Sequence, residues 1–126
     1  MKYLLLAIAF FTAQVTFSQK TIHINEAINK VGDTVTICTK IYGGRFMENS
    51  KGAPTLLNAG ASYPNSPLTV VVTGDARKLF DFKPEEYYKD KSICITGVIE
   101  LYKDKPQIVV TKTSQIVESG KVTPEH

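Results

Sequence analysis

Residues 91–110 read KSICITGVIELYKDKPQIVV, and this stretch decides the fold. Between residues 93 and 99, apolar β-branched side chains alternate with others, which is the period of a strand whose two faces have different surroundings. Residues 102–106, YKDKP, break the alternation with charge and turn formers, and a second strand follows over residues 107–111. Gly97 stands mid-strand, where glycine marks a bulge or the sharp bend that closes a small barrel. The stretch predicts a long, bent strand in an antiparallel hairpin.

Three more strands are predicted before this hairpin. Alternating apolar and polar residues indicate strands over residues 33–42, 55–60 and 68–73. A long polar loop starts at Gly43, after the first of them, and a turn rich in Ser, Pro and Asn separates the other two. With the hairpin, the chain has five predicted strands.

A short helix is predicted over residues 24–32, before the first strand. Asn25 is the expected N-cap and Gly32 the expected C-terminal glycine. Two turns of helix are held only by tertiary packing. The predicted buried face consists of Ile24, Ile28 and Val31.

A second helical segment is predicted between the third and fourth strands. Asp75 is the expected cap of its first turn, and Pro84 followed by two acidic residues favours a helix start. The aromatic residues of this connection are assigned to the core or to a plug of the barrel, and they are Phe80, Phe82, Tyr87 and Tyr88.

The ends of the chain are predicted to lie outside the folded domain. Residues 1–18 have a positive start, a short apolar run and small residues before Gln19, which is the pattern of a secretory signal peptide. The apolar run is shorter than the ~20 residues that a membrane-spanning helix needs. We therefore expect a periplasmic or secreted protein without a membrane span after cleavage. Residues 19–30 are a linker and the short helix, residues 31–117 the domain, and residues 118–126 a flexible tail.

The net charge of the chain excludes few classes of function. The full chain has 15 Lys and Arg against 12 Asp and Glu, and removing Lys2 with the signal peptide leaves a net charge of about +2. This balance is too mild to argue nucleic-acid binding from charge alone. The mixed charge after the signal peptide indicates a soluble domain.

Two cysteines, Cys38 and Cys94, lie in strand-like sequence on the face opposite the isoleucines and valines. An oxidising compartment and an even cysteine count favour a disulfide. The two sulfurs can bridge if their strands pair antiparallel with these residues opposite each other. The alternative is two free, half-buried thiols.

Five strands, with a helical connection between the third and fourth, give the five-stranded Greek-key barrel of the OB fold. The chain resembles the bacterial OB-fold, nucleic-acid-binding-like domains that occur alone or beside secreted nucleases. The resemblance covers residues 31 to about 117. The segments that carry it are VGDTVTICTKIYGGR (31–45), TLLNAGASYPNSPLTVVV (55–72) and YKDKSICITGVIELYKDKPQIVV (88–110). It implies an OB barrel and oligonucleotide binding.

OB folds bind ligands across the second and third barrel strands, flanked by the first-to-second and fourth-to-fifth loops. Cations that follow a phosphate backbone and aromatic rings that stack on bases are what single-strand binding requires. The alternative is that the lysines are solvated charges and the tyrosines half-packed strand ends. The candidate ligand-binding residues are Lys40, Tyr42, Arg45, Phe46, Lys51, Asn58, Tyr63, Tyr102, Lys103 and Lys105.

No enzymatic site and no cofactor are predicted. His23 and His126 have no metal partner nearby in the sequence, and the acidic residues of the helical connection are explained by the helix dipole. No nucleophile-elbow, zinc-protease, phosphate-loop or CxxC motif is present. Three interpretations remain: a module that binds single-stranded nucleic acid, a module that binds an envelope protein or a glycan, and a structural envelope protein.

Overall fold

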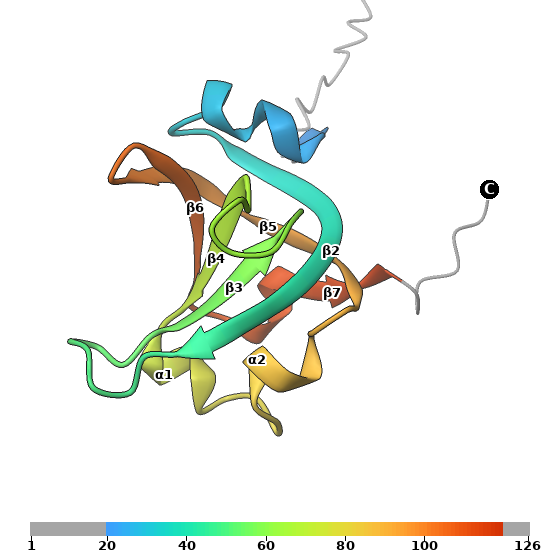
Figure 1. Ribbon diagram of the computed structural model, residues 1–126. Coiled ribbons are helices and arrows are strands. Elements are labelled where there is room, and N and C mark those ends of the chain that lie inside the picture. The colour runs from blue at the N-terminus through green and yellow to red at the C-terminus, as the bar shows by residue number, and fades with distance from the viewer. Residues whose placement is uncertain (1–19, 120–126) are drawn as a thin grey trace, which may run out of the picture.

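The computed structural model describes residues 20–119, so the predicted signal peptide and the residues from 120 onward lie outside the described part (Figure 1). Between residues 20 and 119, no helix is both long and apolar enough to cross a membrane. The strands are β1 (Lys20–Ile22), β2 (Thr34–Phe46), β3 (Thr55–Ala59), β4 (Leu68–Val72), β5 (Ser92–Tyr102), β6 (Lys105–Val110) and β7 (Ile116–Glu118). The helical segments are η1 (Ile24–Asn29), α1 (Gly74–Arg77), α2 (Pro84–Tyr87) and η2 (Thr113–Gln115).

Five strands form a closed barrel in the order β2-β3-β4-β6-β5, and β5 pairs back onto β2. All neighbouring strands are antiparallel except β4 and β6, which run parallel. This is the mixed five-stranded barrel of the OB fold, with its helical connection between the third and fourth barrel strands. The predicted fold is confirmed. Two short strands add to it, with β1 parallel to β2 and β7 antiparallel to β5.

β2 is longer than the sequence predicted. The prediction ended this strand at Tyr42 and started a loop at Gly43, but the strand continues to Phe46. Its first half pairs with β5 and its second half with β3, and the register shifts between Ile41 and Gly44. Gly43 has a φ of +128°, a conformation that favours glycine. The two glycines therefore form a bulge that turns the strand around the barrel, where the prediction had a loop.

β5 changes its partner strand next to Gly97, the position where the sequence predicted a bend. Residues up to Val98 pair with β2, and residues from Ile99 onward pair with β6. A Cβ atom on Gly97 would lie 2.5 Å from Cγ2 of Ile108 on β6. Glycine at this position lets the two strands approach closely where β5 leaves one partner for the other.

The β5–β6 turn is shorter than predicted. Tyr102 pairs with Lys105, so the turn consists of Lys103 and Asp104 alone. Both have positive φ angles, of 51° and 68°, which is the conformation of a two-residue type I′ hairpin turn. Pro106, which was expected in the turn, lies in β6.

The interior of the barrel is filled by alternate residues of its five strands. Burying each of these aliphatic side chains contributes roughly 1.5–3 kcal/mol. The largest fully buried side chains are Val35, Ile37, Ile41, Leu57, Leu68, Val70, Val72, Ile93, Ile95, Ile99, Ile108 and Val110.

One end of the barrel is covered by the connection that contains α1 and α2 (Figure 1). Its aromatic residues pack against one another and against the core, as expected; the Phe82 and Tyr87 rings stack with centroids 4.0 Å apart. Pro84 begins α2 as predicted, but the predicted cap of α1 is wrong. The Thr73 hydroxyl, in place of Asp75, accepts a hydrogen bond from the backbone N–H of Ala76.

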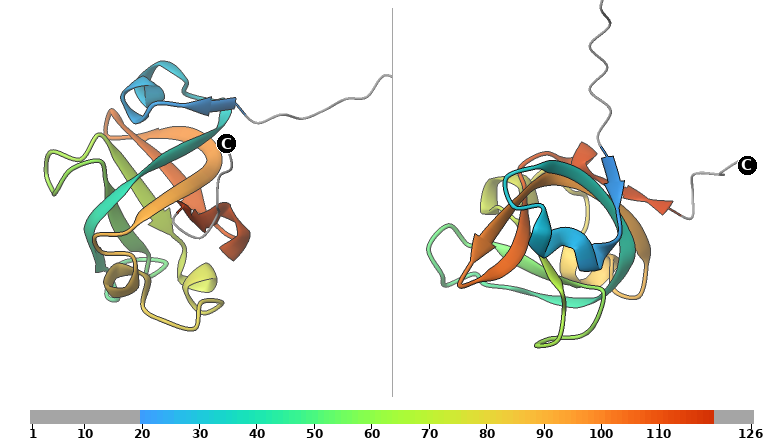
Figure 2. Two further views of the ribbon diagram at one scale, coloured as in Figure 1. Left: turned by 90° about the vertical axis from the view of Figure 1, so that its right-hand side faces the viewer. Right: turned by 90° about the horizontal axis from the view of Figure 1, so that it is seen from above.

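The opposite end of the barrel is covered by η1, which Figure 2 shows from above lying across the strands. This segment is a 3₁₀-helix whose N-cap is His23, where the prediction had an α-helix capped by Asn25. Its fully buried residue is Ala27, and Ile24 packs against the core as predicted, whereas Ile28 and Val31 are 48% and 44% exposed, so the predicted buried face is wrong at these two residues. A 3₁₀-helix repeats every three residues, and this period selects a different face from that of an α-helix.

Cys38 and Cys94 form a disulfide, so the alternative of two free thiols is wrong. The two residues are directly opposite in the β2–β5 register, with Cα atoms 3.9 Å apart. Next to them, the hydroxyls of Thr36 and Thr96 are 2.8 Å apart. All four side chains lie on the face of the strands that points away from the core.

The two segments predicted as linker and tail contribute strands. β1 lies within the predicted linker, and Glu118, which is the first residue of the predicted tail and the last residue of β7, pairs with Ile93 of β5. Gln115 of η2 joins the strands beside β7: its Nε2 atom donates to the carbonyl oxygens of Thr96 on β5 and Val109 on β6.

Candidate ligand-binding face and groove

Side chains that alternate with the core residues of β3, β4 and β6 form a half-buried surface that we call the outer face. Cross-strand register arranges it in two rows, Leu56–Val71–Val109 and Asn58–Thr69–Gln107. Arg45 on β2 pairs with Leu56 at the edge of the first row. The β2–β3 loop and the β5–β6 turn lie toward opposite ends of the barrel (Figure 1). β3 and β4 are the second and third strands of the barrel. OB folds bind ligands on this strand pair, between the loops that correspond to the β2–β3 loop and the β5–β6 turn.

An open groove adjoins the outer face at Asn58 and crosses β2 at its bulge. Its volume is about 660 Å³, within the ~300–1,000 Å³ that is usual for ligand sites. β3 and the β3–β4 loop, which projects from the barrel in Figure 2, contribute Asn58, Ser62 and Tyr63. β2 contributes Tyr42, Gly43 and Gly44, and α2 with the residues after it contributes Glu85, Glu86 and Lys89. We call this the tyrosine groove.

The two tyrosines of the groove expose their side chains. Tyr63 is 78% exposed and Tyr42 is 38% exposed. Lys40 lies beside the second of them, with Nζ 4.9 Å from the centroid of the Tyr42 ring. A Cβ atom on Gly43 would meet no atom within 4 Å, so the bulge leaves open space at this position of the groove.

Glu85 is fixed by an arginine. Arg77 donates from Nη1 to Oε1 of Glu85 over 2.6 Å and from Nη2 to Oε2 over 3.2 Å. Nη1 also donates to the hydroxyl of the buried Thr55. Burial opposes the ionisation of Glu85, but the hydrogen bonds and charge of Arg77 outweigh this effect and lower the pKa of the carboxyl group. Glu85 therefore belongs to the framework of the groove, and the dipole explanation of this residue was incomplete.

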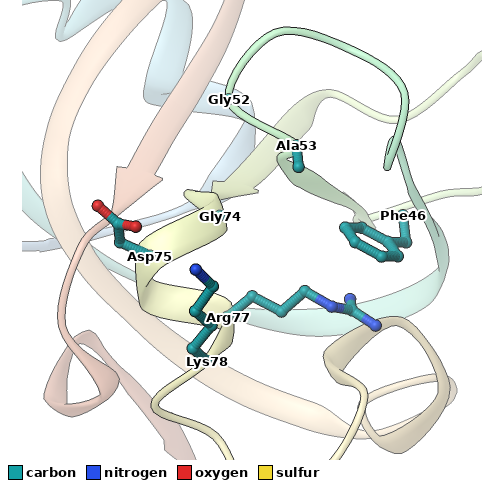
Figure 3. A pocket seen from close by; sticks show the side chains of 7 residues that line it. All are labelled: Phe46, Gly52, Ala53, Gly74, Asp75, Arg77 and Lys78. Carbon is teal, nitrogen blue, oxygen red and sulfur yellow. The ribbon is translucent and has the colours of Figure 1, made fainter.

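A smaller pocket, of about 320 Å³, lies between the β2–β3 loop and α1 (Figure 3). The Arg77 guanidinium carbon lies 3.7 Å from the centroid of the Phe46 ring and covers one of its faces. A Cβ atom on Gly74 would lie 2.4 Å from the carbonyl oxygen of Gly52, so α1 and the loop are in close contact here. The contact with Phe46 in this pocket positions Arg77, the residue that binds Glu85.

Two tyrosines at the end of α2, Tyr87 and Tyr88, have raised pKa values. The hydrogen bond that the Tyr87 hydroxyl donates to Glu118 raises the pKa of Tyr87. Burial raises the pKa of Tyr88 to about 12. Among residues 20–119, no three His, Cys, Asp or Glu side chains are grouped closely enough to hold a metal ion.

The structure separates the sequence-predicted site residues into groups. Tyr42, Asn58 and Tyr63 line the tyrosine groove, and Lys40 contacts Tyr42 at its margin. On and after the end of β2 are Arg45, Phe46 and Lys51, of which Phe46 lines the smaller pocket. The remaining three, Tyr102, Lys103 and Lys105, lie at the β5–β6 turn and do not line the groove.

Sequence reasoning missed the residues that other elements bring to this region. Glu86 and Lys89 reach the groove from α2 and the turn after it, more than 20 positions along the chain from Tyr63. No local pattern distinguishes them from solvated charges. The outer-face residues Leu56, Thr69, Val71, Gln107 and Val109 were detectable, because they alternate with the core residues of predicted strands.

A scan of the sequence against protein-family models finds no match, and a search of curated proteins finds none either. Among solved structures, the chain is similar to a Leishmania major Friedlin protein assigned as an aspartyl-tRNA synthetase, with a TM-score of 0.54 and 16% identity. The match covers 91% of this chain and 24% of that one, so this chain spans about a quarter of the synthetase. A chain of the S. pombe Stn1-ten1 complex has a TM-score of 0.43 and 15% identity over 84% of this chain and 81% of its own length. The likeness to the synthetase concerns the barrel fold alone.

Proposed function

We propose that this protein is a binding module without enzymatic activity of its own, and that it binds short single-stranded nucleic acid in the tyrosine groove. The observation that carries the proposal is that Tyr42 and Tyr63, from separate elements, expose their rings to one groove beside the outer face. Bases of a single strand stack on such rings, and each stacked base contributes about 1–3 kcal/mol. The name of the synthetase indicates that it acts on tRNA, and this agrees with the proposal.

The charges around the groove support an anionic ligand. Lys40 and Lys89 lie at the groove, and Arg45 lies beside the outer face. Because Arg77 neutralises Glu85, one of the two acids of the groove does not repel a phosphate. The cations are placed to follow a phosphate backbone while the rings hold the bases.

A second candidate is a neutral glycan. Glu86 carries a negative charge into the groove, which opposes phosphate but accepts hydrogen bonds from sugar hydroxyls. OB folds also bind oligosaccharides on the face that corresponds to the outer face, which the groove adjoins at Asn58. An envelope protein as partner belongs to this same second interpretation.

We also propose that the protein is periplasmic or secreted. The pattern of residues 1–18 is that of a signal peptide. The Cys38–Cys94 disulfide supports the same location, because disulfides persist in oxidising compartments.

Fluorescence anisotropy tests the proposed function. Labelled single-stranded DNA and RNA 12-mers are titrated with the chain lacking residues 1–18, at low and at physiological salt. We expect saturable binding that weakens with salt, as charge contacts to phosphate require. We expect Tyr63→Ala to weaken binding more than Lys103→Ala/Lys105→Ala, because only Tyr63 lines the groove. Absence of binding at low salt would exclude nucleic acid, and binding of neutral oligosaccharides would then favour the glycan.

A further inference from the structure

Glu86 differs from its neighbour Glu85 in having no ionic partner among residues 20–119. Between residues 20 and 119 the ion pair that forms is Arg77–Glu85, and it occupies both carboxylate oxygens of Glu85. Glu86 is exposed and lines the tyrosine groove, and it is not paired with Lys89, which lines the groove as well. Its two carboxylate oxygens are therefore free to accept hydrogen bonds from a ligand.

Asn58 supplies complementary chemistry to the same groove from β3. Its side-chain amide has two donors and one acceptor, whereas an ionised carboxylate only accepts. The exposed ring of Tyr63 lies in the groove with them and offers a surface on which a base can stack. One stacking surface, one double acceptor and one donor group are the parts that a site needs to read the edge of a base.

Resting on the proposed function, we infer that the tyrosine groove prefers guanine, and that Glu86 is the residue that sets the preference. The Watson–Crick edge of guanine has two adjacent donors, N1–H and N2–H₂, next to the acceptor O6. Adenine and cytosine each present one amino donor beside a ring acceptor, and thymine and uracil present one N–H between two acceptors. Guanine alone among them matches both oxygens of a carboxylate, while O6 accepts from the Asn58 amide.

The preference for guanine follows because each of the other bases leaves one carboxylate oxygen of Glu86 without a donor. A base with one donor places a ring or carbonyl acceptor against the second carboxylate oxygen, and that contact is repulsive. A bidentate contact between a side chain and a base edge discriminates by about 1–3 kcal/mol, which corresponds to a preference of about 5- to 150-fold. We expect about tenfold, because the groove is open to water.

The test uses a thymine 12-mer and three versions of it with one central guanine, inosine or adenine. Inosine lacks the N2 amino group, so it removes one of the two donors and leaves O6 in place. Binding is measured by anisotropy for the unsubstituted protein, for Glu86→Gln, and for the matched control Glu26→Gln. Glu26 is an exposed acid of η1, at the other end of the barrel from α2.

We expect the unsubstituted protein and Glu26→Gln to bind the guanine oligomer about ten times more tightly than the adenine and thymine oligomers, and to bind the inosine oligomer with an affinity between these, because inosine keeps one donor and places no acceptor against the second oxygen. We expect Glu86→Gln to bind all four with similar affinity, and to bind the thymine 12-mer at least as tightly as before. Binding of all four oligomers without preference by the unsubstituted protein, or a guanine preference that survives in Glu86→Gln, would overturn the inference and leave the proposed function intact. Failure to bind any oligomer would overturn both.

Discussion

Arg77 donates hydrogen bonds to both carboxylate oxygens of Glu85 and to the hydroxyl of Thr55, a buried residue of β3. One side chain thus ties α1, α2 and the barrel together at the edge of the tyrosine groove. Arg77→Met leaves the Glu85 carboxylate and the Thr55 hydroxyl without their donor. We expect it to lower the free energy of unfolding by about 2–3 kcal/mol, measured by urea denaturation with far-UV circular dichroism. The control is Lys78→Met, which removes an exposed neighbouring cation and should cost less than about 0.5 kcal/mol. Equal losses in the two variants would contradict the role of Arg77.

The same pair makes stability depend on pH. Because the pKa of Glu85 is lower in the folded chain than in the unfolded chain, the unfolded state binds more protons between the two values. The stabilisation by Glu85 is therefore fully present above the unfolded-state pKa of about 4.3, and it is lost as the pH falls through the folded-state pKa. Glu85→Gln cannot titrate. We expect the difference in unfolding free energy between the unsubstituted protein and Glu85→Gln to be largest near neutral pH and to shrink below about pH 4. A difference that stays constant with pH would refute this.

Gly97 is required by close packing between β5 and β6. A methyl group at this position would lie 2.5 Å from Cγ2 of Ile108, which is fully buried and cannot move aside freely. We expect Gly97→Ala to lower the free energy of unfolding by about 1–3 kcal/mol, as overpacking of a core does. Val98→Ala, at the next and 43% exposed position, is the control and should cost less. An unchanged midpoint of urea denaturation in Gly97→Ala would show that the strands separate more easily than the structure implies.

The Cys38–Cys94 disulfide joins residues 56 positions apart. In the chain-entropy description, closing a loop of this length in the unfolded state stabilises the fold by about 4 kcal/mol. We therefore expect Cys38→Ala/Cys94→Ala to unfold at a much lower urea concentration than the oxidised protein. Reduction of the unsubstituted protein should give a similar midpoint. Two alkyl groups added to the native protein without reductant, seen by mass spectrometry, would mean that the bridge does not form.

The barrel could be predicted because the patterns that specify its strands lie within short stretches of the sequence. Alternation in residues 93–99 and in the earlier strands marks the buried face directly, and Gly97 stands where a strand of that pattern has no other reason for a glycine. The pairing of the two cysteines could also be predicted, because both residues fall on the outward face of strands that the fold places side by side. These features depend on sequence periods and on one known topology.

Other features depend on contacts between distant residues, and the sequence does not display them. Gly43 and Gly44 look like a turn, yet the pairing of β2 with two different strands makes them a bulge inside one strand. The N-cap was assigned to Asn25 by type, whereas the Nδ1 atom of His23 accepts the hydrogen bond.

The candidate site was predictable only in part, for the same reason. Tyr42, Asn58 and Tyr63 lie on segments that the expected topology places together, and the structure brings them to one groove. Glu86 and Lys89 reach that groove from a connection whose path the sequence did not specify. The β5–β6 turn is charged, as the sequence predicted, but its lysines do not line the groove.

The central claim is that ligand binds in the tyrosine groove, and a ¹H–¹⁵N NMR titration with a single-stranded thymine 12-mer tests it most directly. Each backbone amide reports separately, so the site is mapped without any substitution. We expect the largest shift changes at the amides of Tyr42, Gly43, Asn58 and Tyr63, with smaller changes at Lys103 and Lys105. Saturating changes confined to the β5–β6 turn, with the groove amides unmoved, would contradict the account.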